Sequence, residues 1–230
     1  MKIGGFQKTS LLDYPEEISA IIWTLGCNFN CPFCYNPDVV KKTAKIISEE
    51  EILSFLEKRK NVIDGLVITG GEPFLQKDIG SFCEKIKKIG YKIKIDTNGT
   101  YPEKLKELLD NKIVDYIAMD VKAPKGKYKK LAGVDVDISK IDESIQIIKN
   151  KAPDYEFRTT VVPGLISLKD VVEIAKWLEN SKRFYLQQFK DNAFHISEKF
   201  DNVRPYDFTE LNQMLQKVKP YFKECFLRGA

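Results

Sequence analysis

Short apolar segments alternate with amphipathic helical patterns along this chain, and this alternation constrains its fold more than any other feature. The predicted strands cover 18–25, 65–69, 92–97, 116–121, 155–162 and 183–189. The predicted helices cover 48–58, 76–89, 102–109, 139–149, 167–179 and 208–218, and a last short strand is expected at 225–227. Six strand-then-helix units with apolar strands predict a parallel sheet covered by helices.

Two architectures fit such a pattern, an open doubly wound sheet and a partial or full barrel. The unusual residues favour the barrel, because they stand where successive strands end: Cys27, Gly70 to Pro73, Asp96 to Asn98, and Asp120 to Lys122. Several strand ends that converge on one site are typical of a barrel, whereas a doubly wound sheet concentrates its site at one switch point. We therefore expect an α/β fold, a partial (β/α)6 TIM-like barrel of parallel strands with its site at their C-terminal ends.

Length and charge indicate an ordinary globular protein. No linker-like break interrupts the 230 residues, so we expect one domain over 1–230, with an N-terminal extension at 1–17, a β/α core at 18–190 and a C-terminal extension at 191–230. The 37 basic and 33 acidic residues give a net charge of +4, a balance that argues against a dedicated nucleic-acid binder. No signal peptide or membrane-spanning stretch is recognisable, so we expect a cytoplasmic protein whose cysteines are reduced and free to bind metal.

Three of the five cysteines fall within eight residues, directly after the first predicted strand. Cys27, Cys31 and Cys34 have the spacing C-x3-C-x2-C, which lets three thiolates converge on one iron–sulfur cubane. A [4Fe–4S] cluster normally takes four cysteine ligands, so three would leave one iron open to bind a small molecule. The cysteine loop is therefore the first candidate for a metal centre.

A zinc site is the alternative for these cysteines. It would need a distant fourth ligand, and His195, the only histidine, is the natural candidate. A lone histidine in a polar loop is more often solvated, and three incidental buried cysteines are a further reading. Cys83 lies on the apolar face of a predicted helix and Cys225 in the tail, so neither is assigned a ligand role.

The other strand ends carry polar residues that have ordinary explanations when each is taken alone. Gly70 and Gly71 allow a ligand to approach the backbone, and Glu72 can pair with an ammonium group. The segment 96–99 has the composition of a turn, and 120–122 that of a solvated strand end. Arg158 shares a strand face with Thr160, and if it points inward it needs a carboxylate partner.

Together these residues resemble a known family. The C-x3-C-x2-C motif, with Phe33 before its last cysteine, resembles the motif of the radical S-adenosylmethionine (radical SAM) superfamily. The resemblance implies that Cys27, Cys31 and Cys34 hold a [4Fe–4S] cluster and that the open iron binds SAM. One electron from the cluster then splits SAM and yields a 5′-deoxyadenosyl radical. Phe33 is implied to lie near the adenine.

The resemblance continues at the later strand ends, in Gly-Gly-Glu-Pro, Asp-Thr-Asn-Gly and Asp-x-Lys segments like those of enzymes that activate glycyl-radical enzymes. It implies that the Gly-Gly-Glu-Pro segment contacts the amino group of the methionine part of SAM. It also implies that Asp96, Asp120 and Thr97 help to hold a monovalent cation, and that the Asp-x-Lys pair, Asp120 and Lys122, lies near the ribose. Arg158 is implied to pair with the cofactor carboxylate. The implied cofactor-binding residues are Phe33, Gly70, Gly71, Glu72, Asp96, Thr97, Asn98, Asp120, Lys122 and Arg158.

The N-terminal segment 6–15 and Tyr35-Asn36-Pro37 resemble the activating proteins of anaerobic ribonucleoside-triphosphate reductase, with pyruvate formate-lyase activators as relatives. This implies a glycyl-radical enzyme as protein substrate and a flavodoxin or ferredoxin as electron donor. Relatives often carry histidine where this chain has Tyr35 and Lys190. A radical SAM enzyme acting on a small molecule or nucleotide, and a zinc or iron–sulfur protein without catalysis, stay open as alternatives.

A lysine-rich segment, 122–130, holds five lysines in nine residues. The plain interpretation is a solvated loop. A docking surface for an acidic partner is the main alternative, with a nucleic-acid contact as a third.

Overall fold

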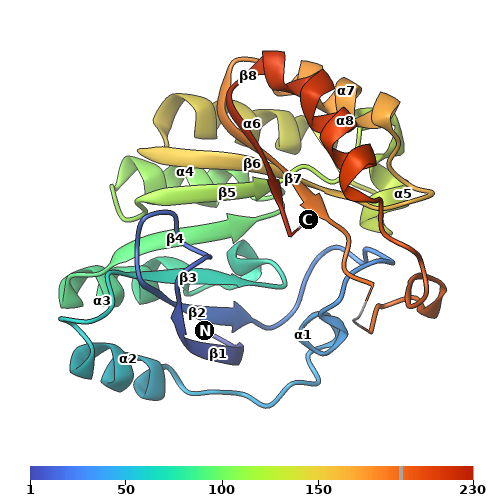
Figure 1. Ribbon diagram of the computed structural model, residues 1–230. Helices are drawn as coiled ribbons and strands as arrows, with labels where there is room; N and C mark the ends of the chain where they lie inside the picture. The colour runs from blue at the N-terminus through green and yellow to red at the C-terminus, as the bar shows by residue number, and fades with distance from the viewer. Residues whose placement is uncertain (192–193, 230) are drawn as a thin grey trace.

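The computed structural model describes residues 1–191 and 194–229 and shows one curved eight-stranded sheet with helices on its outer side (Figure 1). The strands are β1 Ile3–Ser10, β2 Ser19–Thr24, β3 Gly65–Gly70, β4 Lys92–Thr97, β5 Tyr116–Asp120, β6 Asp154–Val161, β7 Ser181–Gln188 and β8 Phe222–Arg228. The helices are α1 Pro37–Lys41, α2 Glu49–Lys58, α3 Ile79–Ile89, α4 Pro102–Asp110, α5 Tyr128–Ala132, α6 Ile138–Lys151, α7 Leu168–Trp177 and α8 Phe208–Val218. Short 3-10 turns lie at Pro73–Leu75, Lys125–Lys127, Glu198–Phe200 and Lys219–Tyr221.

Strand order in the sheet follows chain order from β1 to β8. Strands β2 to β8 run parallel to their neighbours, and β1 pairs antiparallel with β2. The edge strands β1 and β8 do not pair with each other in the described chain, so the barrel is open on one side. The expected α/β partial barrel of parallel strands is confirmed.

The predicted element bounds agree closely with the structure. Strand β4 and helix α8 begin and end at the expected residues, and Gly90 ends α3 in the left-handed conformation. Strand β1 was not expected, because its two glycines and its run of polar residues hide any strand pattern. It covers the edge of β2, where Gly5 lies against the Trp23 ring.

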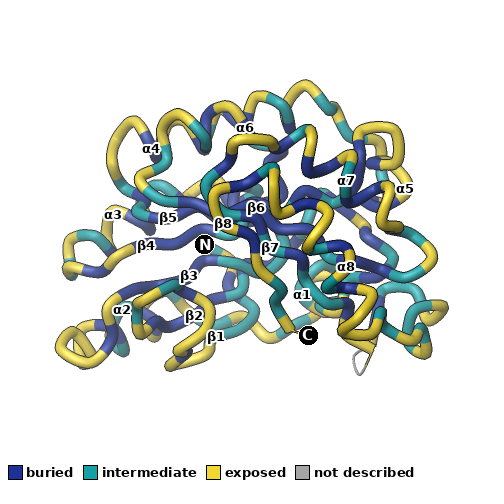
Figure 2. The backbone as a smooth tube through the Cα atoms, turned by 45° about the horizontal axis from the view of Figure 1, so that its top comes forward, coloured by how far each residue is buried: buried dark blue, intermediate teal, exposed yellow. Residues whose placement is uncertain are grey.

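Successive side chains of a strand point to opposite faces of the sheet, so the same strands contribute to the core on one face and to the site on the other. On β4, Ile93 and Ile95 are fully buried on the helix-covered side, while Lys94 and Asp96 lie on the inner face. An apolar cluster fills another part of the inner face: Tyr14, Ile21, Val67, Tyr116 and Ala118. Figure 2 shows the strands as the buried centre and the outer turns of the helices as exposed. None of the helices in the described ranges is long and apolar enough to cross a membrane.

Candidate functional site

The three clustered cysteines lie on the loop that follows β2. Cys31 is buried, and Cys27 and Cys34 are partly buried. A turn in which the Cys34 amide donates to the Cys31 carbonyl (3.0 Å) sets the second half of the loop. The Phe29 amide donates to the Cys27 sulfur at 3.3 Å. Hydrogen bonds within the loop therefore fix the backbone that carries the three thiols.

Backbone hydrogen bonds from distant segments hold this loop in place. The Asn30 amide donates to the carbonyl of Ala132 (2.8 Å), at the end of α5. The amides of Ile196 and Ser197 donate to the carbonyls of Cys34 (3.0 Å) and Pro32 (2.9 Å). The cysteine loop is therefore held by α5 and by the chain after β7, and this part of the chain forms one wall around the cysteines.

The donor set of the loop is three thiols, the type of ligand that iron–sulfur clusters take. Burial raises the pKa of the Cys27 thiol to about 12 and that of Cys31 to about 11, so metal must displace protons to bind there. Across residues 1–191 and 194–229, no three histidine, cysteine, aspartate or glutamate side chains converge on one point suited to a metal ion.

His195 is not the solvated histidine expected from its polar surroundings. Its side chain has no exposed surface, and its ring stacks on Phe189 with centroids 5.0 Å apart. Its two ring nitrogens face the Asp201 carboxylate (2.9 Å) and the Lys190 carbonyl (3.0 Å). The ring therefore secures the loop after β7 and is not free to complete a zinc site.

The glycine pair at the end of β3 packs directly on the cysteine loop. A Cβ atom on Gly71 would stand 1.9 Å from the Gly26 carbonyl oxygen, so only glycine fits there. Gly70 has a φ of +115°, in the region that favours glycine. The Glu72 amide donates to the same Gly26 carbonyl at 2.9 Å. The glycines thus allow the end of β3 to pack closely on the cysteine loop.

Glu72 is fully buried and links three strand ends. Its carboxylate accepts hydrogen bonds from the Phe74 amide (3.1 Å), the Thr97 hydroxyl (2.8 Å) and the Asn98 amide (2.8 Å). Burial raises the pKa of Glu72 to about 7, although these hydrogen bonds oppose the shift. Asn98 in turn donates from its side chain to Asn28 in the cysteine loop (2.9 Å). The Glu72 carboxylate therefore connects the segment after β3 with the end of β4.

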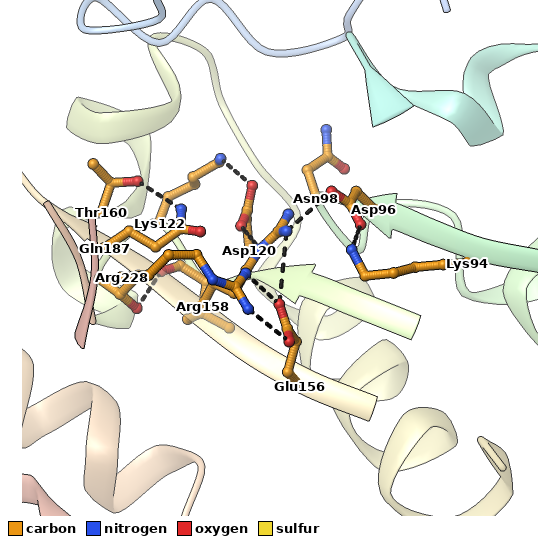
Figure 3. Close-up of polar contacts among 12 residues, drawn as sticks. Lys94, Asp96, Asn98, Asp120, Lys122, Glu156, Arg158, Thr160, Gln187 and Arg228 are labelled. Carbon is orange, nitrogen blue, oxygen red and sulfur yellow. Dashed lines mark hydrogen bonds and ion pairs between the residues drawn. The ribbon is translucent and has the colours of Figure 1, made fainter. Parts of the chain in front are cut away.

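Charged side chains from β4, β5 and β6 meet on the inner face of the barrel (Figure 3). Arg158 donates from Nε to Asp120 (2.8 Å) and from Nη1 to Asp96 (3.0 Å). Lys94 pairs with the second oxygen of Asp96 (2.5 Å), and Lys122 with that of Asp120 (2.9 Å). These five side chains are called the ion network below.

Electrostatics in the ion network keep both aspartates ionised. Burial, the largest single cause, would raise the pKa of Asp96 and of Asp120. The charges of Arg158 and of the neighbouring Lys94 or Lys122, together with the hydrogen bonds from these groups, outweigh burial, and both pKa values are lowered. Arg158 is 8 % exposed and points inward, which fulfils the condition under which a carboxylate partner was expected. Its partners within this chain are the two aspartates. Both aspartates that were expected at a monovalent cation thus already have cationic partners.

The lysine-rich segment has two kinds of lysine. Lys122 is mostly buried against Asp120, whereas Lys125, Lys127 and Lys129 form outer pairs with Asp142, Asp170 and Asp135. Local aspartates thus neutralise most of the segment, which favours the plain loop over an acidic-partner surface.

The two departures from the family pattern touch each other. The Lys190 ammonium lies 4.7 Å from the centroid of the Tyr35 ring, next to Cys34. Phe33 is buried, with its ring edge-on to Phe200 (6.4 Å between centroids). Where histidines often stand in relatives, this chain has a cation–aromatic pair.

Sequence reasoning missed Glu156, Arg228 and Lys94. Glu156 and Arg228 form a two-pronged ion pair (2.7 and 3.1 Å), and Glu156 also accepts from the Tyr116 hydroxyl (2.9 Å). The period of two in β6 could have placed Glu156 beside Arg158 on one face. No sequence signal connects it with Arg228, which is 72 residues away.

The chain is similar in sequence to known proteins. The sequence profile described as the radical SAM superfamily matches residues 21–178. A protein of Methanocaldococcus jannaschii named "Putative glycyl-radical enzyme activating enzyme" is 34% identical over 98% of this chain and 95% of its own length. A "Probable GTP 3',8-cyclase" of Saccharolobus islandicus is 29% identical over 89% of this chain and 66% of its own length.

Solved structures share the fold at low sequence identity. SuiB of Streptococcus suis superposes with a TM-score of 0.69 and 18% identity, over 91% of this chain and 49% of that one. A domain of pyruvate-formate lyase-activating enzyme from Bacteroides vulgatus gives a TM-score of 0.54 and 17% identity, over 72% of this chain and 99% of that one.

Proposed function

Since this chain belongs to the radical SAM superfamily, we propose that it activates a glycyl-radical enzyme by removing a hydrogen atom from one glycine of that partner. The cofactors of the superfamily are a [4Fe–4S] cluster and SAM, and the chain is an enzyme of this class. When bound, they supply one electron and a 5′-deoxyadenosyl radical. The protein contributes binding, orientation and the exclusion of side reactions.

Each role in this proposal is assigned to a residue of the cysteine loop or of the strand ends. Cys27, Cys31 and Cys34 would ligate three irons and leave the fourth to SAM. Phe33 would lie near the adenine, and Lys122 and Asp120 near the ribose. Gly70 and Gly71 would offer backbone groups to the methionine part, while Glu72 holds their loop. Arg158 would orient Asp96 and Asp120 by pairing with both.

The observation that carries the proposal is the full-length match to a protein named as an activating enzyme of this type. The unclosed barrel supports it, because a protein substrate can itself cover an open barrel mouth, whereas a small substrate usually needs a closed pocket. The segment 6–15 and Tyr35-Asn36-Pro37 favour an anaerobic ribonucleotide reductase as the partner. A flavodoxin or ferredoxin would supply the electron.

The test is an anaerobic assay with the reconstituted enzyme, a reductant, SAM and an anaerobic ribonucleotide reductase. We expect the electron paramagnetic resonance signal of a glycyl radical, with a matching amount of 5′-deoxyadenosine. The controls are the Cys27→Ala enzyme and a partner in which alanine replaces the acceptor glycine. A radical signal that survives either control would contradict the proposal.

A nucleotide substrate is the second candidate, because relatives named as GTP cyclases share most of this chain. In the same assay, nucleotide added without partner protein would then raise the yield of 5′-deoxyadenosine. Such a rise without any glycyl radical would replace the first proposal by the second.

A further inference from the structure

The side chain of Arg228, at the end of the last strand, points into the barrel. Arg228 ends β8, the free edge of the sheet, and its guanidinium carbon lies 3.9 Å from the centroid of the Tyr185 ring. From there it holds both oxygens of Glu156 (2.7 and 3.1 Å). Figure 3 shows this pair next to Arg158. A residue at the open edge is thus in contact with the interior beneath the proposed cofactor site.

Glu156 competes for the guanidinium of Arg158. Its nearer oxygen lies 3.8 Å from Nη1 of Arg158, the same nitrogen that donates to Asp96 at 3.0 Å. In the described chain, the carboxylates that face Arg158 within ion-pair distance are Asp96, Asp120 and Glu156. A guanidinium has five N–H donors, so Arg158 can turn to Glu156 when that carboxylate lacks another partner.

Burial makes the competition strong. Glu156 is 0 % exposed, and an unpaired charge in such a place is very costly. Burial would raise its pKa, yet the hydrogen bonds from Arg228 and the charge of Arg158 lower it. The Tyr116 hydroxyl is a neutral donor and leaves the charge uncompensated. If Arg228 were removed, Glu156 would therefore pair with the nearest remaining cation, Arg158.

We propose that Arg228 is a positioning residue for SAM binding, because its pairing with Glu156 keeps Arg158 on Asp96 and Asp120. This rests on the proposed function, in which the two aspartates border the SAM site. Arg228 itself lies on the edge strand and acts through Glu156 and Arg158. The last strand thereby takes part in the site although it carries no residue of the family motifs.

The first test measures SAM affinity by equilibrium binding to the reconstituted proteins, with iron content confirmed to match. We expect Arg228→Gln to weaken binding about tenfold. The double variant Glu156→Gln/Arg228→Gln should return to within about threefold of wild type, since its competing charge is gone. The conservative Arg228→Lys should lie between them. A double variant as weak as the single one would overturn the proposal, and so would unchanged affinity in Arg228→Gln.

A second measurement does not depend on SAM. Anaerobic crystal structures of wild type and Arg228→Gln should show Nη1 of Arg158 moved from Asp96 toward Glu156 in the variant only. An unmoved Arg158 would overturn the proposal even if affinity changed. If the wild type bound no SAM, the proposed function would fail while this structural comparison still decided the role of Arg228. Should Arg228→Gln not fold, Glu156→Gln alone must keep wild-type SAM affinity, and a tenfold loss there would refute the inference.

Discussion

The cysteine loop and the ion network both lie at the C-terminal ends of the strands, but different forces hold them. The loop is fixed by backbone hydrogen bonds, such as those from Asn30 to Ala132 and from Ile196 to Cys34, and by close packing at Gly71. The ion network is fixed by charges on Arg158, Asp96 and Asp120. Glu72 joins the two, because its amide bonds the loop and its carboxylate bonds the end of β4.

This difference teaches what each region tolerates. A loop held by its backbone depends little on which side chains surround it, provided that nothing larger than glycine stands at the point of closest approach. A charged network inside a barrel depends on every partner, because the loss of one leaves another charge buried and unpaired. Substitutions can therefore separate the two regions.

The largest effect is expected from the thiols themselves. Replacing Cys27, Cys31 or Cys34 by alanine should abolish cluster iron and SAM cleavage, since each thiolate would be the only protein ligand of its iron. Iron analysis and the yield of 5′-deoxyadenosine measure this. The matched control is Cys83→Ala, which removes a buried thiol from α3 and should cost about 1–2 kcal/mol of stability with iron unchanged. Wild-type turnover by Cys27→Ala would refute the assignment.

Removing the centre of the ion network comes next. Arg158→Met should lower the free energy of unfolding by about 3 kcal/mol, because it leaves two partly buried carboxylates without their shared partner. Denaturant unfolding of the cluster-free protein measures it. The comparison pair is Lys169 with Glu173, exposed on α7, where Lys169→Met should leave stability nearly unchanged. Equal effects of the two substitutions would show that the network is not a buried charge system.

How far sequence predicts such a molecule depends on the range of the interaction. Strand β4 and helix α8 could be placed residue by residue, because period-two and period-3.6 patterns are local. The sequence also placed Arg158 on one strand face with Thr160, but it gave the inward direction only as a condition. Its partners could not be predicted, because Asp96 and Asp120 lie 62 and 38 residues away and meet it only through strand order.

The missed features share this cause. The expected last strand ended at Leu227, so Arg228 fell outside it, and its contact with Glu156 needs the whole sheet in between. His195 was expected to be solvated because a lone histidine in a loop with many polar residues usually is. In the fold it is buried by Phe189 and bonded by Asp201, neither of which a local pattern connects with it.

A smaller and purely steric effect is expected at Gly71. Gly71→Ala should cost about 1–3 kcal/mol and reduce cluster occupancy, because the added Cβ would collide with the Gly26 carbonyl and push the two loops apart. Thermal unfolding and iron content measure both consequences. Gly126→Ala is the control, since nothing lies within 4 Å of a Cβ at that position. If both variants retain full iron, close packing does not set the position of the cysteine loop.

The smallest effect is expected in the lysine-rich segment, and it separates two lysines of one sequence motif. Lys129 and its partner Asp135 are 73 % and 85 % exposed, so Lys129→Ala should change the free energy of unfolding by less than about 0.5 kcal/mol. Lys122 is 17 % exposed and belongs to the ion network, so Lys122→Ala should weaken SAM binding. Partner affinity at low salt provides the sharper measurement. If Lys129→Ala alone lowers the affinity for the partner, the segment is a docking surface. If the affinity does not change, a lysine of this segment is functional because it is buried in the ion network, and not because the segment is rich in lysine.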